Sequence, residues 1–188
     1  MTNFLALSLI VSMGAPGSIH RQAIQYFENG QYSNAASLCR EALSRQEPGS
    51  LETALLLRDL SRAYRGEGLL NKALAARRQE VEILKIRLGE DDANIALALD
   101  GIGEIYFEQR RFTAARKSFE DALRIGEKSL EANSPHLAII FNDLGAVYYR
   151  DGRAAEAAKL LRRALAIRED GVARANLAQV ERAVASRR

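Results

Sequence analysis

The sequence predicts an all-α fold, namely an α-solenoid of about four helix pairs that ends in a C-terminal capping helix. Glycine and tyrosine positions recur 42 residues apart, which relates Gly103 to Gly145 and Tyr106 to Tyr148. Apolar residues within each unit follow the period of an amphipathic helix, and no segment shows the sustained alternation of a strand. A composition with 47% hydrophobic residues and only 3 prolines supports a buried core made of helices.

The first 17 residues are expected to be a signal peptide or an extra apolar helix. Residues 4–15 form an uncharged apolar run that is too short to span a bilayer, and small residues at 15–17 resemble a cleavage site. Cleavage before Ser18 would make the protein exported, either periplasmic or secreted. Because residues 1–3 contain no Lys or Arg, a cytoplasmic protein with an extra N-terminal helix remains the alternative.

The repeat array is expected over residues 18–170. Its four units cover approximately residues 18–47, 50–91, 92–133 and 134–170. The last three units each begin with a suitable N-capping residue, namely Ser50, Asp92 and Ser134. Three units carry a glycine between their two helices, where a left-handed residue ends a helix, namely Gly30, Gly68 and Gly152. Residues 171–188 are expected to form a capping helix and a basic tail.

Two glycines inside helices point to close helix packing. Gly103 and Gly145 fall within the first helices of their units, where a glycine costs about 1 kcal/mol relative to alanine. We expect each glycine to let the second helix of its unit approach closely. Arg77 stands where the next unit has Phe119 on the packed face of its second helix. The sequence therefore predicts weaker or more exposed packing around Arg77.

One pattern resembles a known repeat family. Leu-x-x-Ile-Gly-x-x-Tyr at residues 99–106, followed by Phe112, Ala115, Phe119 and Ala122, resembles the tetratricopeptide repeat. The longer period and the connectors between units are similar to the kinesin-light-chain type of these repeats. The resemblance covers about residues 18–170 and implies a right-handed solenoid whose first helices line a concave groove. It also implies a non-catalytic scaffold that binds a protein or peptide segment, whose identity the repeats do not give.

Positions on the first helices that lie off the packed stripe are the candidate binding residues. They are Arg58, Arg62, Arg65, Asp100, Glu104, Phe107, Asn142 and Tyr149. The first unit offers the corresponding positions His20, Ile24 and Phe27. We expect the aromatic members to hold an apolar anchor of the ligand. The resemblance implies that Asn142 hydrogen-bonds the backbone of an extended peptide.

The charged candidates form two stripes on neighbouring helices. Three arginines give the second unit a basic stripe, and Asp100 and Glu104 give the third unit an acidic one. Either the stripes neutralise each other across the groove, or they bind a segment with acidic side chains over unit two and polar or basic ones over unit three. Arginine is well suited to bidentate recognition of carboxylates.

Composition and motifs argue against nucleic-acid binding and against catalysis. The formal net charge of +3 is small and the charges are interleaved, which argues against nucleic acid as the partner. A basic regulator that contacts nucleic acid or anionic membrane through its outer helices and Arg-rich tail is kept as the alternative. The two histidines are far apart and no phosphate loop or nucleophile elbow occurs, so we predict no enzyme, cofactor or metal.

Cys39, the single cysteine, is expected to be buried. Homo-oligomerisation stays open, and no transmembrane segment is expected.

Overall fold

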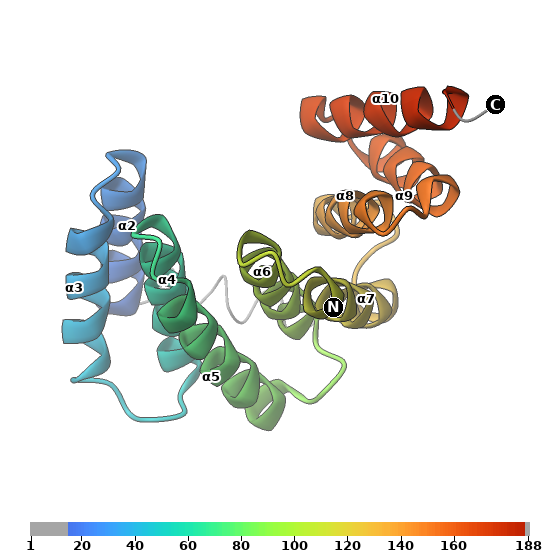
Figure 1. Ribbon diagram of the computed structural model, residues 1–188. Helices are drawn as coiled ribbons and strands as arrows, with labels where there is room; N and C mark the ends of the chain where they lie inside the picture. The colour runs from blue at the N-terminus through green and yellow to red at the C-terminus, as the bar shows by residue number, and fades with distance from the viewer. Residues whose placement is uncertain (1–14, 187–188) are drawn as a thin grey trace.

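The computed structural model describes residues 15–186, and over this range the chain is built of α-helices and their connections (Figure 1). The helices are α2 (Ala15–Glu28), α3 (Tyr32–Leu43), α4 (Leu51–Gly66), α5 (Leu70–Leu88), α6 (Ala93–Glu108), α7 (Phe112–Ser129), α8 (Pro135–Arg150), α9 (Ala154–Ile167) and α10 (Gly171–Ala185). The all-α prediction is confirmed. The expected signal peptide or extra helix lies outside the described residues, apart from residues 15–17, which belong to α2.

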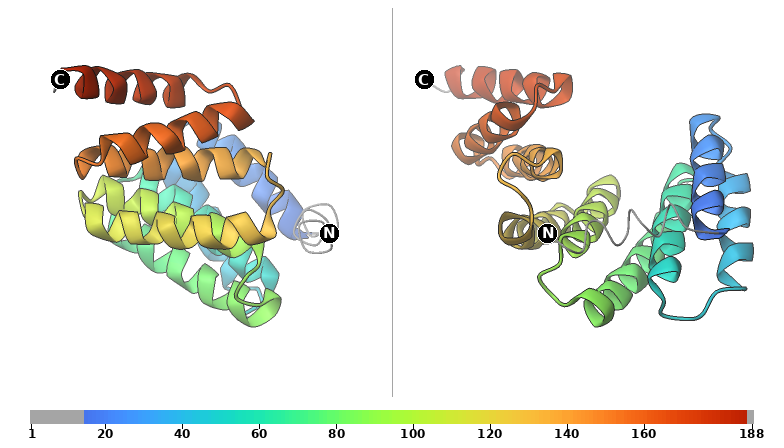
Figure 2. Two further views of the ribbon diagram at one scale, coloured as in Figure 1. Left: turned by 90° about the vertical axis from the view of Figure 1, so that its right-hand side faces the viewer. Right: turned by 180° about the vertical axis from the view of Figure 1, so that it is seen from behind.

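The helices stack as pairs along a curved path. The pairs are α2/α3, α4/α5, α6/α7 and α8/α9, and each pair packs against the next (Figure 2). First helices also touch one another across units, because α2 contacts α4, α6 contacts α8, and α8 contacts α10. They therefore lie on the inner side of the curve, and the predicted α-solenoid is confirmed.

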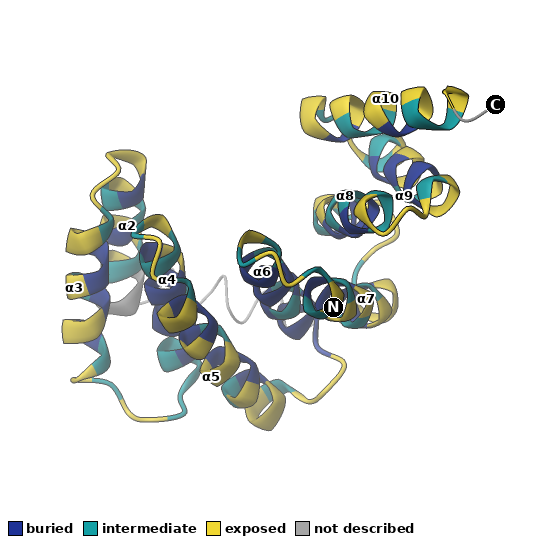
Figure 3. Ribbon diagram, viewed as in Figure 1, coloured by how far each residue is buried: buried dark blue, intermediate teal, exposed yellow. Residues whose placement is uncertain are grey.

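Buried side chains lie on the helix faces that meet a neighbouring helix, while the outer faces are exposed (Figure 3). Phe119 and Ile105, each 1% exposed, belong to the largest cluster, which joins the second, third and fourth pairs. Ala173 and Val180 of α10, each also 1% exposed, pack against the clusters formed by α8 and α9. The last helix thus shields the apolar end of the array, as a terminal cap must.

The expected caps and turn residues are present. Three side chains accept a backbone hydrogen bond in the first turn of α4, α6 and α8, namely Ser50, Asp92 and Ser134. Three glycines between paired helices have positive φ, namely Gly30 at 67°, Gly68 at 73° and Gly152 at 78°. In the third unit Arg110 holds the equivalent position with a φ of 59°, a conformation that costs a non-glycine residue about 1 kcal/mol.

The glycines inside α6 and α8 allow the close packing that the sequence predicts. A Cβ atom added at Gly103 would lie 2.5 Å from the ring of Phe119, and one at Gly145 would lie 3.0 Å from Leu161. In the second unit Ser61 holds the same position, and its hydroxyl donates a 2.8 Å hydrogen bond to the carbonyl oxygen of Ala73. A small residue is required at each of these crossings.

Arg77 is more exposed than Phe119 and Leu161 at the equivalent positions, as the sequence predicts, but its charged group is held by a specific contact. The side chain of Arg77 is 16% exposed, and its Nη1 donates a 2.8 Å hydrogen bond to Oε2 of Glu80, which is itself buried. The guanidinium group lies against Gly101, where an added Cβ would come within 2.7 Å of it. A buried ion pair therefore replaces the apolar contact of the other units, and the missing side chain at Gly101 provides the space.

Cys39 is buried in the core formed by the first two pairs, as expected. Burial raises the pKa of its thiol to about 12, with a smaller contribution from the charge of Asp59. The thiol therefore stays protonated at neutral pH, and its role is to fill space.

Candidate functional site

The inner side of the stack contains two adjoining hollows, which we call together the inner groove. The first, of about 190 Å³, lies among α4, α6 and α8 and includes Arg65, Phe107 and Ala146 in its lining. The second, of about 220 Å³, lies among α8, α9 and the start of α10 and includes Ile139 and Val172. Both hollows are lined by Glu104 and Asp143, so these carboxylates mark the junction.

A regular contact between successive units explains why the first hollow is open. In the first two units the guanidinium group of Arg62 lies over the ring of Phe27, 4.3 Å from its centroid. One unit later the same two positions hold an ion pair between Arg65 and Glu104. In the next unit they hold Phe107 and the small Ala146, which both line the hollow. The short side chain of alanine leaves Phe107 half-buried in the lining of the hollow, although the guanidinium group of Arg150 lies 5.5 Å from the centroid of its ring.

The carboxylates of the inner groove are crowded. Asp100 is 8% exposed, and its Oδ1 has no hydrogen-bond partner. Burial raises the pKa of Asp100 well above its ordinary value, and the charges of Asp143 and Glu104 add to the shift. Burial likewise raises the pKa of Asp143 to about 7, and the charge of Glu104 is the next cause. Simultaneous ionisation of both carboxyl groups is therefore unfavourable in the free protein.

The cations of the second unit are engaged by other groups. Arg65 bonds to Glu104 and, through Nε, to Oε1 of Glu108 at 2.6 Å. The structure thus supports neutralisation between the two stripes at Arg65. Arg58 lies farther along the inner side, where its charge acts on the buried Glu80 and, together with the larger effect of burial, lowers the pKa of His136.

The other candidate residues divide between groove and core. Asn142 donates from Nδ2 to Oδ1 of Asp143 at 2.9 Å and accepts from Nδ2 of Asn176 on α10 at the same distance. Tyr149 is half-buried against the cluster of α9 and α10 and does not line either hollow. The expectation that Phe27 faces the groove is wrong, because Phe27 is 6% exposed and belongs to the core. Its burial follows from the cover that Arg62 provides.

Several groove residues were not anticipated from the sequence. Asp143 follows the predicted Asn142 directly, and Ile139 and Val172 are 41% and 63% exposed despite being large and apolar. The signal for Ile139 and Val172 is their place near the starts of α8 and α10, away from the apolar stripe. The signal for Asp143 is its register with Asp59, which forms a 2.6 Å contact with Nδ1 of His20.

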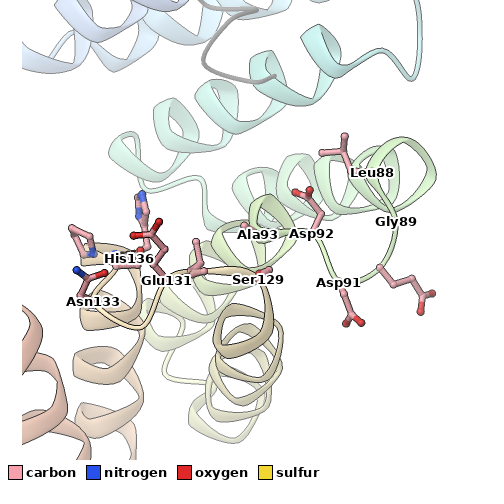
Figure 4. A pocket seen from close by; sticks show the side chains of 13 residues that line it. Leu88, Gly89, Asp91, Asp92, Ala93, Ser129, Glu131, Asn133 and His136 are labelled. Carbon is pink, nitrogen blue, oxygen red and sulfur yellow. Dashed lines mark hydrogen bonds between the residues drawn. The ribbon is translucent and has the colours of Figure 1, made fainter. Parts of the chain in front are cut away.

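A larger cavity, of about 1090 Å³, opens between the α5–α6 and α7–α8 connections (Figure 4). Its labelled side chains come from these two loops and the adjoining helix ends. Asp92 is used as the cap of α6, and Asp91 pairs with Lys128 at 3.3 Å and with Arg124 at 3.8 Å. Because these carboxylates serve the connections themselves, we place the candidate site in the inner groove.

Neither a metal-binding cluster nor a membrane-spanning helix is found in the part of the chain that the structure describes. Residues 15–186 contain no group of three or more His, Cys, Asp or Glu side chains suited to a metal ion. None of the helices in the same range has the length and hydropathy that a bilayer crossing requires.

Residues 94–170 match the family model of the tetratricopeptide repeat. This part of the chain consists of tetratricopeptide repeats. The fold of the chain is that of kinesin-light-chain-like repeats: it superposes on TPR-like repeats of a kinesin light chain from Podosopora anserina with a TM-score of 0.77 and 22% identity, covering 93% of this chain and 90% of that one. BtubC (BKLC) from P. vanneervenii gives a TM-score of 0.76 at 25% identity, covering 89% and 72%. Comparison with curated proteins gave no match.

A more distant likeness is also informative about the fold alone. The pilF protein of Pseudomonas aeruginosa superposes with a TM-score of 0.71 at 19% identity, covering 88% of this chain and 67% of that chain. Tetratricopeptide repeats serve in general as scaffolds for protein–protein interaction, and such proteins are typically non-catalytic. The fold therefore supports a binding role, and the residues of the inner groove must supply its specificity.

The raised pKa of Asp143 predicts a pH-dependent stability. Its folded-state pKa of about 7 exceeds the unfolded value of about 3.9, so the folded protein binds more protons between these limits. Stability should therefore fall as the pH rises from about 4 to about 7. We expect Asp143→Asn to raise the free energy of unfolding by about 2 kcal/mol at pH 8 and to change it little near pH 4.

Urea denaturation at the two pH values measures this effect. Glu82→Gln is the matched control, because Glu82 is exposed on the outer helix α5 and should give no pH-dependent difference. A variant Asp143→Asn that is less stable than the wild type at pH 8 would show that the ionised carboxylate stabilises the groove.

Proposed function

We propose that the protein is a non-catalytic scaffold that binds an extended peptide or protein segment along the inner groove. The observation that carries this proposal is the pair of adjoining hollows, in which partly uncovered apolar side chains lie beside carboxylates. An apolar centre with a polar rim is the usual composition of a protein interface. Phe107 in the first hollow and Ile139 and Val172 in the second are the apolar contacts that we assign to the partner.

The paired state of the outer arginines favours this proposal over a basic regulator of nucleic acid or membrane. Arg116 of α7 pairs with Asp151, and Arg163 of α9 pairs with Glu127 at 2.8 Å. Arg162 pairs with Glu181 of the capping helix at 2.6 Å. A polyanion would have to displace these carboxylates before it gained the same contacts. Export through residues 1–17 remains a separate proposal, which intact-mass measurement of the protein from its own host would test.

Phe107→Ala is expected to weaken binding of a partner captured from the native host by about 1 kcal/mol or more. The ring lies in the first hollow and is only partly covered, so its loss removes apolar area that the partner would bury. Binding of the purified partner is measured by calorimetry, and circular dichroism checks that helicity is retained. Val172→Ser is a second variant that avoids the core, because Val172 is 63% exposed.

Ile86→Ala provides the matched control on the opposite side of the array. Ile86 lies on the outer helix α5 and is 80% exposed, so its truncation also removes apolar surface without touching the groove. If Ile86→Ala abolishes binding while Phe107→Ala and Val172→Ser do not, the partner binds the convex face and the proposal fails.

A further inference from the structure

We propose that the inner groove recognises a basic residue of its partner, with the ammonium or guanidinium group of a lysine or arginine held at the junction of the two hollows by Glu104 and Asp143. This inference rests on the proposed function, because it assumes that a peptide segment occupies the groove. It adds the chemical class of the residue that the groove selects. Four observations carry it: the balance of charge, a missing cation, an unpartnered carboxylate and the shape of the hollows.

The charge balance of the inner groove is negative. Its lining contains four carboxylates and two arginines, namely Glu104, Glu108, Asp143, Asp170, Arg65 and Arg168. Arg65 is shared by Glu104 and Glu108, and Arg168 lies 3.5 Å from Asp170. Among the described residues, no cation forms an ion pair with Asp143, whose hydrogen-bond donor is the amide of Asn142. A cation from outside would therefore meet a carboxylate that has a hydrogen bond from Asn142 but no ion pair.

The repeat register shows that a cationic partner is missing at this place. In the first two units the side chain of His20 contacts Asp59 at 2.6 Å. Two units later the same positions hold Asp100 and Asp143, so a carboxylate faces a carboxylate. Asp100 is more than nine-tenths buried, and its Oδ1 has no hydrogen-bond partner. Asp100 itself lines neither hollow, but a cation held beside Asp143 would reduce the repulsion between the two carboxylates.

The shape of the first hollow suits a long basic side chain. Its walls include Phe107, Phe119 and Ala146, which can pack against the methylene groups of lysine or arginine while the charged end reaches Glu104 and Asp143. The second hollow continues from the same carboxylates toward Ile139 and Val172, which would contact an apolar residue next to the basic one. The groove therefore fits a short basic–apolar sequence better than an acidic one.

An acidic segment over unit two is disfavoured by the same contacts. Arg65 is already bonded to two carboxylates, and Arg62 is stacked on the ring of Phe27. The stripes predict a ligand that is acidic over unit two and polar or basic over unit three; we keep the basic part and place it between the third and fourth units. An anionic partner would have to compete with Glu104 and Glu108 for Arg65.

Binding of a cation should release protons from the groove. The pKa of Asp143 is about 7 in the free protein, and a cation placed beside it would lower that value. The charged and polar groups that act on Asp143 and its partner Asp100 are Glu104, Arg65, Arg77, Asn142 and Asp170. The affinity for a basic peptide should therefore increase as the pH rises from about 6 to about 8. An uncharged peptide should show no such increase.

The test begins with the full-length protein and a displayed library of random peptides. We expect the enriched peptides to share a lysine or arginine, and we expect its replacement by alanine to weaken binding at least about 10-fold. Asp143→Asn should weaken binding of the parent peptide by a similar factor. It should have little further effect on the alanine peptide, because the two changes remove one interaction. Glu82→Gln on the outer helix is the control and should leave the affinity unchanged.

The remaining outcomes separate this inference from the proposed function. Enriched peptides that lack a basic residue, yet are weakened by Val172→Ser and Phe107→Ala, would overturn the basic anchor and leave the groove as the binding site. Peptides that respond to none of the groove variants would overturn both proposals, as would a library that yields no binder. A loss of affinity in Asp143→Asn that is the same for the parent and alanine peptides would show an indirect effect and would also overturn the basic anchor.

Discussion

Gly103→Leu is expected to lower the free energy of unfolding by about 3 kcal/mol, because it overpacks the crossing of α6 and α7. A Cβ atom alone would lie 2.5 Å from the ring of Phe119, which is 1% exposed and surrounded by the main core cluster. The ring therefore cannot move aside without displacing its neighbours. The better helix propensity of leucine returns only about 1 kcal/mol of this loss.

Chemical denaturation followed by circular dichroism measures the change. Gly103→Ala should show a smaller loss in the same direction, since the clash begins at the Cβ atom. Gly171→Ala is the control, because no atom lies within 4 Å of the added methyl group at the start of α10 and the effect should stay within about 0.5 kcal/mol. An unchanged stability of Gly103→Leu would mean that α6 and α7 do not cross at this residue.

Much of the fold could be predicted because each repeat carries its own local signals. The capping side chains and the glycines between helices are recognisable from the sequence, since their backbone roles depend on few neighbours. Gly103 could be assigned a packing role because its cost within a helix requires a compensating contact. These features determine where helices begin, end and cross, which is most of the architecture.

The groove was harder to predict because it depends on contacts between units. Glu104 and Phe107, which the register places on the groove side, line the first hollow, but the register gives Phe27 the same exposure as Phe107. The next unit contributes to the difference, because Arg62 lies 4.3 Å from the centroid of Phe27, whereas Ala146 is short and Arg150 lies 5.5 Å from the centroid of Phe107. The burial of Phe27 and the partial exposure of Phe107 depend on which residue of the following unit faces each ring.

The ion pair of Arg77 can be inferred only when two positions are considered together. Arg77 stands at an apolar position, and the position three residues later also departs from the pattern. Glu80 stands where the third and fourth units have Ala122 and Ala164. Two replacements of opposite charge on one face indicate an ion pair, and Gly101 on the adjoining helix supplies the space that the pair requires.

Arg77→Leu is expected to lower the free energy of unfolding by about 3 kcal/mol or more at pH 8, because it leaves Glu80 as a buried carboxylate without its nearest cation. Glu80 is 4% exposed, and burial is the main cause that raises its pKa, while Arg77 and then Arg58 lower it. Removal of Arg77 should raise this pKa further. The penalty then appears as the pH rises above about 4 and is complete above the new folded-state pKa, so the deficit should be small near pH 4.

The double variant Arg77→Leu/Glu80→Ala separates the loss of the ion pair from the loss of packing. It installs the residues that the fourth unit carries at these positions, Leu161 and Ala164, which are 0% and 2% exposed. Buried ion pairs are often no more stabilising than well-packed apolar residues, so we expect the double variant to recover most of the stability at pH 8 and to lose the pH dependence of the deficit. Urea denaturation of the two single variants and the double variant at both pH values completes the cycle. A double variant that is less stable than Arg77→Leu alone would show instead that Arg77 and Glu80 each make an independent contribution to packing against Gly101.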